Sequence, residues 1–166
     1  MIDIVYNIID DDYILFLLNN INDKNFDTPI TSKSFKNYYN RYKLEPKDYL
    51  KHQLESYLSE KYGKPYILQN NGFWINKVTT ESNKDDEFHI DDSDLSIVTY
   101  LNDDFDGGYF EYIDSKNEKI KIKPQRGMSI IINSKIEHRV LPVKKGTRYS
   151  GVFFFDYITK NKKTLL

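Results

Sequence analysis

The chain has 166 residues, of which 30% are charged, with a formal net charge of −1 and no cysteine. This length fits one hydrophobic core, so we expect residues 1–166 to form a single domain. A net charge near zero gives no reason to expect nucleic acid or an anionic membrane as a partner. The lack of cysteine excludes a disulfide scaffold and a thiolate metal site.

The N-terminal segment has no features of a secretory leader. Residues 1–12 carry acidic side chains and no basic cluster, and the longest apolar run, 13–18, is too short to span a bilayer. We therefore expect a cytoplasmic protein with no membrane-spanning segment. The oligomeric state is left open.

Two helices are predicted in the first third of the chain. The acidic residues 10–12 precede an apolar run, which is typical of the first turn of a helix. A second helix is predicted from Pro46 to Gly63, because apolar residues recur there at helical spacing: Tyr49, Leu50, Leu54, Tyr57 and Leu58. The polar segment 23–44 is expected to be a loop with at most one short strand.

After Pro65, segments rich in β-branched and aromatic residues alternate with turn signals. The predicted strands are 66–69, 73–80, 95–101, 108–113, 118–122, 128–132, 139–143 and 149–157. The turn signals are Asn71-Gly72, Asp106-Gly107-Gly108, Pro124 with Gly127, and Lys145-Gly146. This pattern predicts a mainly β (α+β) fold: a double-stranded β-helix, or jelly roll, over 65–160, with helices in 1–64 packed on one sheet.

Two histidines and one aspartate form a candidate metal-binding set. His89 and Asp91 lie two residues apart, and such residues of an extended segment point to the same face. His138 precedes a later predicted strand, and a jelly roll can bring it beside the first pair. Two histidines and one carboxylate form the facial triad of non-haem Fe(II) oxygenases, which leaves other coordination positions open. Taken alone, the pattern also fits an ordinary surface pair.

The segments around this set occur as six ordered blocks: HID at 89–91, LSIVTYLN at 95–102, DGGYFE at 106–111, PQRGMSIII at 124–132, EHRVLPV at 137–143 and GTRYS at 146–150. Over residues 73–157 this arrangement resembles the catalytic domain of the prolyl 4-hydroxylase-like Fe(II)- and 2-oxoglutarate-dependent oxygenases. The resemblance implies a dioxygenase with Fe(II) as metal, 2-oxoglutarate as cosubstrate and ascorbate as reductant.

The resemblance also implies roles for individual residues. His89, Asp91 and His138 match the iron ligands. Arg148 matches the basic residue that pairs with the distal carboxylate of 2-oxoglutarate, which the planar guanidinium fork suits. Tyr100 matches a tyrosine that hydrogen-bonds the same carboxylate in some relatives, although a core tyrosine fits this position equally well.

The substrate is less defined by the sequence. Many relatives carry a tyrosine shortly before the first iron histidine, and residues 76–88 contain none, so Trp74 and Phe88 are candidates to line that side. By resemblance, the expected reaction is hydroxylation of a prolyl residue in a protein or peptide, with release of succinate and CO2. A free amino acid or another small molecule is the alternative substrate.

Acidic residues crowd the segments that flank the candidate ligands: Glu81, Asp85, Asp86, Glu87, Asp92, Asp94, Asp103, Asp104 and Asp106. If these loops gather at the mouth of the site, they predict a substrate of basic character. Solvated loop acids in an Asp-rich chain explain the same pattern.

Two other classes of protein are compatible with the fold. A non-catalytic jelly-roll binding module is one, because fold alone does not define function. It needs none of the three ligands or Arg148, so their joint presence argues against it. A cupin-like enzyme generally uses more histidines than the three in this chain.

Overall fold

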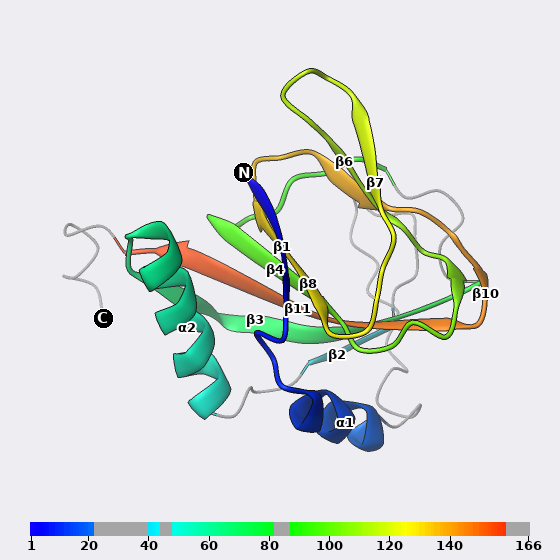
Figure 1. Ribbon diagram of the computed structural model, residues 1–166, viewed down its shortest axis with the longest axis horizontal. Coiled ribbons are helices and arrows are strands. Elements are labelled where there is room, and N and C mark those ends of the chain that lie inside the picture. Colours follow the sequence, from blue (N-terminus) through cyan, green and yellow to red (C-terminus); the bar gives the residue numbers. More distant parts are fainter. Residues whose placement is uncertain (22–39, 44–47, 82–86, 159–166) are drawn as a thin grey trace.

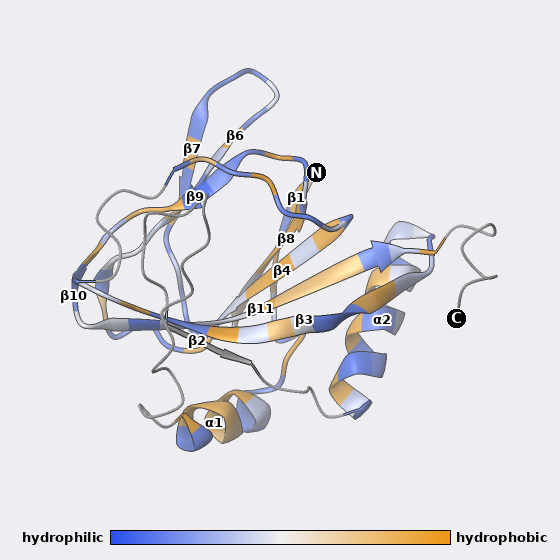
Figure 2. Ribbon diagram, turned by 180° about the vertical axis from the view of Figure 1, so that it is seen from behind, coloured by the Kyte–Doolittle hydropathy of each residue, from blue (hydrophilic) through white to orange (hydrophobic). Residues whose placement is uncertain are grey.

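The computed structural model describes residues 1–21, 40–43, 48–81 and 87–158. A six-stranded antiparallel sheet in the order β1-β8-β4-β11-β3-β2 forms its centre (Figure 1). Its strands are β1 Ile2–Tyr6, β2 Asn40–Lys43, β3 Tyr66–Thr79, β4 Leu95–Tyr100, β8 Met128–Asn133 and β11 Thr147–Tyr157. Figure 2 shows hydrophobic residues concentrated along the central strands of this sheet.

Two smaller sheets complete the β structure. One has the order β7-β6-β9 and the other pairs β10 with β5. Their strands are β5 Asp106–Gly107, β6 Phe110–Ile113, β7 Lys119–Ile122, β9 His138–Val140 and β10 Val143–Lys145. The three-stranded sheet packs over the inner face of the large sheet through a core that includes Tyr100, Phe110 and Ile130. The predicted jelly roll is therefore confirmed.

Two helices, α1 Asp11–Asn20 and α2 Asp48–Tyr62, cover the outer face of the large sheet. The Asp10 carboxylate accepts a hydrogen bond from the backbone N–H of Tyr13 at 2.7 Å and so caps α1. Leu50, Leu54 and Leu58 of α2 are buried against that face. This confirms that helices pack on one sheet, while Pro46 lies outside the described residues.

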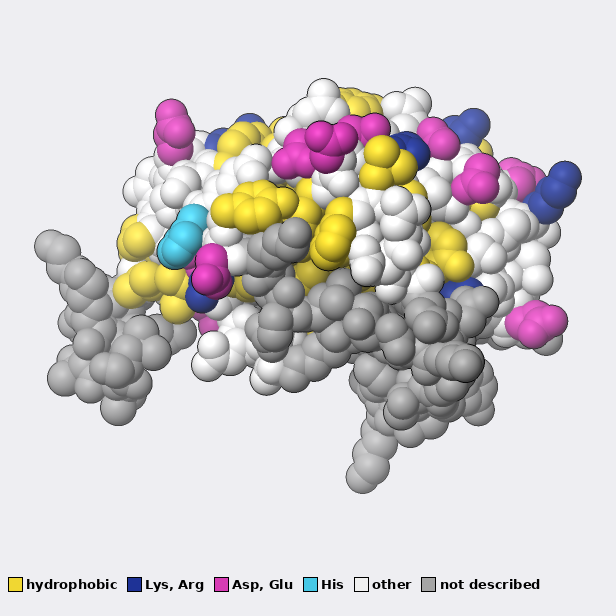
Figure 3. All heavy atoms as spheres, turned by 90° about the horizontal axis from the view of Figure 1, so that it is seen from below, with side chains coloured by type: hydrophobic (Ala, Val, Ile, Leu, Met, Phe, Trp, Pro, Cys, Tyr) yellow, Lys and Arg dark blue, Asp and Glu magenta, His cyan; other side chains and the backbone are white. Residues whose placement is uncertain are grey.

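On the helix side of the described surface, apolar side chains are exposed singly or in small groups (Figure 3). In the view of Figure 3, hydrophobic side chains form small groups among polar and charged ones. The exposed apolar residues of the two helices are Leu15, Phe16 and Tyr49. Neither helix has the length and hydropathy needed to cross a membrane, and the same holds throughout the described part of the chain.

Alternation along the central strands separates two environments. Ile97 of β4 and Phe153 of β11 point to the helices and join the outer core. Their neighbours Val98 and Val152 point to the other side, where they line a cavity. A strand reverses its side chains at every residue, so one face of each strand stabilises the sheet and the other shapes the site.

The structure differs from the prediction in four respects. β1 and β2 were not assigned as definite strands, yet both join the large sheet, so two of its strands come from the first 64 residues. β5 was missed because it has only two residues. The predicted strand 139–143 is divided into β9 and β10.

The fourth difference concerns the Asn71-Gly72 turn signal, which does not separate two strands. β3 continues through both residues, and the pairing register with β11 shifts between Phe153 and Phe155. Asn71 has a φ of 62°, and a Cβ on Gly72 would lie 2.9 Å from the carbonyl oxygen of Gln69. The turn residues therefore form a bulge in one long strand, because β11 pairs with both halves.

Candidate metal centre and adjoining cavity

An antiparallel bridge brings the two candidate histidines together. The backbone N–H of His89 donates to the carbonyl of His138, and the N–H of His138 donates back, each at 2.9 Å. Residues directly opposite in such a bridge project to the same face. His138 also belongs to β9, which pairs with β6, so His89 extends the edge of the three-stranded sheet.

Backbone carbonyls orient both imidazole rings. Nδ1 of His89 lies 3.1 Å from the carbonyl oxygen of Glu87, and Nδ1 of His138 lies 2.8 Å from that of Ile136. A carbonyl only accepts hydrogen bonds, so each Nδ1 carries the proton and each Nε2 presents a lone pair. Phe110 stacks on the His138 ring with centroids 5.3 Å apart, which limits the rotation of that ring.

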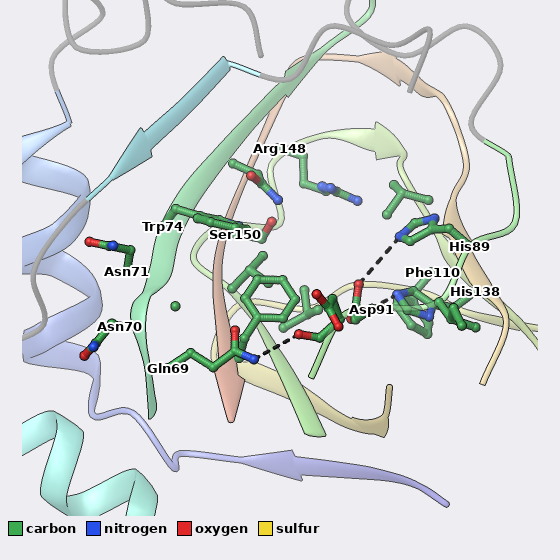
Figure 4. Close-up of a pocket in the computed structure, with 18 residues that line it drawn as sticks. Gln69, Asn70, Asn71, Trp74, His89, Asp91, Phe110, His138, Arg148 and Ser150 are labelled. Carbon is green, nitrogen blue, oxygen red and sulfur yellow. Dashed lines mark hydrogen bonds and ion pairs between the residues drawn. The ribbon is translucent and has the colours of Figure 1, made fainter. Parts of the chain in front are cut away.

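Asp91 lies between the two Nε2 atoms (Figure 4). Its Oδ1 is 3.9 Å from Nε2 of His89, and its Oδ2 is 3.5 Å from Nε2 of His138. One ligand atom from each of the three residues lies within 4.8 Å of the others. Two neutral imidazoles and one carboxylate on one side of a point suit a divalent transition metal with open positions, so the donor set fits Fe(II).

A cavity of about 530 Å³ adjoins the three side chains. Figure 4 shows His89, Asp91 and His138 on one side of it, with Trp74, Arg148 and Ser150 on another. The cavity lies between the inner face of β3, β4 and β11 and the strands β6 and β9, and exposed residues such as Asn70 and Ile90 line its open side. A ligand in this space can therefore meet both the candidate metal site and the side chains of the large sheet.

Arg148 is a buried charge at this cavity. Its side chain is only 1% exposed, its Nη1 donates to the carbonyl of Gly108 at 3.3 Å, and its Nε has no hydrogen-bond partner. Among the described residues, no carboxylate forms an ion pair with it. A buried guanidinium without a counter-ion is costly, which indicates that an anionic ligand belongs beside it.

Further buried polar atoms without partners lie near Arg148. They are Oγ of Ser150, Oδ1 of Asn76 and the hydroxyl of Tyr100. Burial raises the pKa of Tyr100 to about 12, although the Arg148 guanidinium lowers it, so the phenol keeps its proton and can donate. A cation, a hydroxyl and a phenol donor fit the carboxylate of a small dicarboxylic acid.

Glycine permits the close approach of Arg148 to the chain. Gly108 has a φ of 61°, and a Cβ there would lie 3.3 Å from Cδ of Arg148 and 3.2 Å from Cγ2 of Val143. Both the backbone conformation and the space favour glycine. The turn signal at Asp106-Gly107-Gly108 therefore also supports the wall of the cavity.

Trp74 and Phe88 were both candidates to line the site, and of the two only Trp74 is among the residues that line the cavity. Phe88 instead packs beneath the guanidinium of Arg139, whose Cζ lies 4.5 Å from the ring centroid, and Arg139 also pairs with the buried Glu111 at 2.6 Å. This contact restrains the residue that precedes His89.

The acidic residues expected at the mouth of the site are only partly placed by the described residues. Among the described acids other than Asp91, Asp92 is the one that lines the cavity. Asp103 accepts from the backbone N–H of Arg126, and Asp104 accepts from the side chain of Asn102. Asp85 and Asp86 lie outside the described residues.

Sequence analysis did not identify the buried polar residues that support Asp91 and Arg148. Ser96 contacts Asp91, and Ser150 and Asn76 face the same cavity as Arg148. One signal was present: Ser96 in β4 and Ser150 in β11 stand at positions that share a face with the apolar Val98 and Val152. A polar residue at an inward position of a buried strand marks a site of this kind.

Comparisons with known proteins agree with this geometry. Residues 74–156, half of the chain, match the model of the 2OG-Fe(II) oxygenase superfamily. A stretch of 66 residues is 38% identical to prolyl 3-hydroxylase 1 of Gallus gallus. That stretch covers 37% of this chain and only 9% of the length of the relative.

Two solved structures share the fold over almost the whole chain. A Trichoplax adhaerens prolyl hydroxylase, in complex with a peptide fragment of the hypoxia inducible factor oxygen degradation domain, has a TM-score of 0.73 at 16% identity. It covers 99% of this chain and 86% of its own. A Pseudomonas putida prolyl-4-hydroxylase has a TM-score of 0.69 at 14% identity, covering 95% and 93%. At these identities the likeness concerns the fold.

Proposed function

The chain belongs to the 2OG-Fe(II) oxygenase superfamily, and from that premise we propose that it hydroxylates a prolyl residue in a protein or peptide. Its family depends on Fe(II) and 2-oxoglutarate, and an oxygenase is the enzyme class that the match supports. The observation that carries the proposal is the pairing, in one cavity, of the His89, Asp91 and His138 cluster with the buried Arg148, which forms no ion pair with a carboxylate of the described residues.

In this proposal His89 and His138 bind Fe(II) through Nε2, and Asp91 binds it through its carboxylate. Both rings are already oriented by carbonyl groups, so little conformational freedom is lost when the metal binds. When bound, Fe(II) and 2-oxoglutarate would supply the chemistry by which dioxygen hydroxylates a C–H bond, with one oxygen atom entering the product and the other entering succinate as CO2 is released.

Arg148 holds the distal carboxylate of 2-oxoglutarate, with Ser150 and Tyr100 as additional donors. Nε of Arg148 and the two hydroxyls are buried and have no hydrogen-bond partner among the described residues, so the ligand would supply hydrogen bonds that they otherwise lack. The apolar side chains of Val98, Phe110 and Val152 line the same cavity as the metal ligands. The chain thereby offers the cosubstrate a charged and hydrogen-bonding end and an apolar wall.

The other side of the cavity supports a peptide as substrate. Asn70 and Asn71 in the bulge of β3, together with Gln69, line the side opposite the histidines (Figure 4). Asn70 and Asn71 are exposed, and carboxamides can both donate to and accept from a peptide backbone. The sequence relative and the structural neighbours named above are prolyl hydroxylases, which favours a prolyl target.

The direct test measures succinate formation and oxygen incorporation with Fe(II), 2-oxoglutarate and ascorbate. Proline-containing peptides, with matched lysine or glutamate flanks, are compared with free proline and with peptides that carry alanine in its place. The expected result is turnover and a hydroxylated prolyl residue only with the proline peptides. The flanking charges separately test whether Asp92 favours a basic substrate.

Two outcomes contradict the proposal. Turnover with a free amino acid but with no peptide would make the chain a small-molecule hydroxylase. Binding of a divalent metal and 2-oxoglutarate without any decarboxylation would favour a non-catalytic module. The His138→Ala variant serves as the blank, because it retains β9 but lacks one candidate ligand.

A further inference from the structure

Three buried serines form a hydrogen-bonded cluster directly behind Asp91. They are Ser93, Ser96 and Ser134, with exposed fractions of 6%, 0% and 0%. Oγ of Ser134 lies 2.6 Å from Oγ of Ser93 and 2.9 Å from Oγ of Ser96. The Ser96 hydroxyl donates to Oδ2 of Asp91 at 2.5 Å, the short distance of a hydroxyl bound to a charged carboxylate.

The direction of these hydrogen bonds follows from counting donors. An ionised carboxylate only accepts, so the proton of Ser96 points to Asp91. Ser96 can then only accept from its serine neighbours, and Ser134 is the nearer of them. The Ser93 hydroxyl has two acceptors within reach, Oγ of Ser134 at 2.6 Å and the carbonyl of Leu95 at 3.2 Å. When it donates to the nearer one, a chain of hydrogen bonds runs from Ser93 through Ser134 and Ser96 to the carboxylate. Hydrogen bonds aligned in one direction polarise and strengthen one another.

Packing alone does not explain three hydroxyls in this place. Alanines would avoid the cost of burying polar groups, and replacing a whole set of mutually bonded partners by apolar groups is often nearly neutral for stability. The one ionisable side chain that hydrogen-bonds to the cluster among the described residues is Asp91. The serines therefore have a role that alanines could not fill, because alanine cannot donate a hydrogen bond to Asp91.

We propose that Ser96, supported by Ser134 and Ser93, is a positioning residue that presents Asp91 to the metal through Oδ1 alone. This inference rests on the proposed function, since it assigns a metal-binding role to Asp91. Oδ2 accepts the Ser96 proton and lies 3.5 Å from Nε2 of His138, which leaves Oδ1, 3.9 Å from Nε2 of His89, as the oxygen not engaged by a hydroxyl. A carboxylate held in this way binds through one oxygen and leaves a further coordination position open.

Backbone hydrogen bonds also hold both ends of segment 91–94, which contains Asp91 and Ser93. The N–H of Asp91 donates to the carbonyl of Ser134 at 2.9 Å, and the N–H of Asp94 donates to the carbonyl of Phe155 at 3.0 Å. Ser96 lies in β4, and Ser134 directly follows β8. The serine cluster thus connects segment 91–94 to β4 and β8 of the large sheet before any metal is bound.

The test compares Ser96→Ala with Ser129→Ala, which is a matched control. Ser129 is also fully buried and pairs with the hydroxyl of Thr99 at 2.7 Å on the same two strands, β8 and β4, but it does not contact Asp91. Affinity for Mn(II) and the absorption spectrum of bound Co(II) are measured for both variants and for the unaltered chain. Thermal unfolding of each metal-free protein is recorded in parallel.

Ser96→Ala is expected to weaken Mn(II) binding by roughly 10- to 100-fold, the range typical for loss of a partner of a metal ligand. Its Co(II) spectrum should change, because the carboxylate is free to bind through both oxygens. Ser129→Ala should leave both properties unchanged while lowering thermal stability to a similar extent. Equal Mn(II) affinity in Ser96→Ala and Ser129→Ala would overturn the proposal.

A second variant decides the matter if Ser96→Ala does not fold. Ser134→Ala keeps the contact between Ser96 and Asp91 and removes only its support, so a smaller loss of Mn(II) affinity is expected. Unchanged affinity in Ser134→Ala would then overturn the proposal. If the unaltered chain binds no divalent metal, the proposed function fails as well. If it binds metal and the serine variants do the same, only the role of the serines is wrong.

Discussion

The two faces of the six-stranded sheet use the same strands for opposite purposes. On the face toward the helices, β11 presents Phe153 and Phe155, which are fully buried in an apolar core. On the face toward the cavity, the same strand presents Arg148 and Ser150, which are equally buried but have polar atoms without partners. Burial is similar on both sides, and only the chemistry of the side chains differs.

This contrast separates the sources of stability and function. Apolar burial on the helix face stabilises the fold, whereas buried unpaired polar groups on the cavity face destabilise the free protein. Such groups become favourable only when a ligand supplies their partners. The cavity face is therefore the part of the sheet whose composition is explained by binding rather than by folding.

The largest expected effect comes from the three candidate metal ligands. His89→Ala, Asp91→Ala and His138→Ala should each abolish turnover and leave the fold largely intact. Each removes one of three protein bonds to the metal, and none belongs to the apolar core on the helix face. Iron binding, succinate formation and circular dichroism would be measured for each variant. Near-normal iron affinity and activity in any two of them would contradict the assignment.

Arg148→Ala should raise the 2-oxoglutarate concentration needed for half-maximal activity much more than it weakens iron binding. Removing one side of a buried charge pair typically costs about 3–5 kcal/mol, equivalent to roughly 10²- to 4 × 10³-fold in affinity. Arg148→Lys should do less harm, because it keeps the charge and loses the fork. Saturation curves for 2-oxoglutarate provide the measurement.

The control for this comparison is Arg126→Ala. Arg126 is a partly exposed arginine that pairs with Asp11 at 2.8 Å, away from the residues that line the cavity. It should leave the saturation curve unchanged. If Arg148→Ala and Arg126→Ala behave alike, Arg148 does not hold the cosubstrate.

Paired substitutions on the two faces test the contrast itself. Leu54→Ala removes a fully buried side chain of α2 and should lower the free energy of unfolding by about 2–5 kcal/mol. Ser150→Ala removes a buried hydroxyl that has no partner, so it should leave the stability of the free protein unchanged or raise it, while weakening 2-oxoglutarate binding. Denaturant unfolding would measure the stability of both variants, and titration would measure their affinity for 2-oxoglutarate. A large loss of stability in Ser150→Ala would mean that the cavity face stabilises the fold in the same way as the helix face.

The smallest expected effect concerns Tyr100 at alkaline pH. Because burial raises its pKa from 10.0 to about 12 in the folded chain, the unfolded chain loses this proton first. The contribution of Tyr100 to stability is therefore fully present below pH 10 and is lost as the pH rises toward 12, with a slope of roughly 1.4 kcal/mol per pH unit.

Tyr100→Phe should accordingly show a shallower loss of stability between pH 10 and 12 in denaturant unfolding. Some alkaline dependence should persist in the variant, because burial and the hydrogen bond to Asp3 also raise the pKa of Tyr62. The same variant should bind 2-oxoglutarate slightly more weakly, as it lacks one donor. An unchanged alkaline slope would mean that the Tyr100 phenol is not buried as described.

Local sequence patterns were sufficient for much of the fold. The apolar repeat of Leu50, Leu54 and Leu58 predicted a helix and its buried side, and alternating strands with turn signals predicted the jelly roll. These features depend on spacing along the chain, which the sequence states directly. β1 was missed because it is a short edge strand with Ile4 and Tyr6 half exposed, so its pattern lacks a buried face.

The candidate ligands were also visible in the sequence, because His89 and Asp91 are two residues apart and the ordered blocks place His138 and Arg148 after them. Their arrangement was decided only by tertiary structure. The bridge between His89 and His138, the serine cluster behind Asp91 and the lack of a counter-ion at Arg148 all join segments distant in sequence. Hydrogen bonds and burial between distant segments depend on the folded geometry, and no local pattern encodes which polar atom is left without a partner.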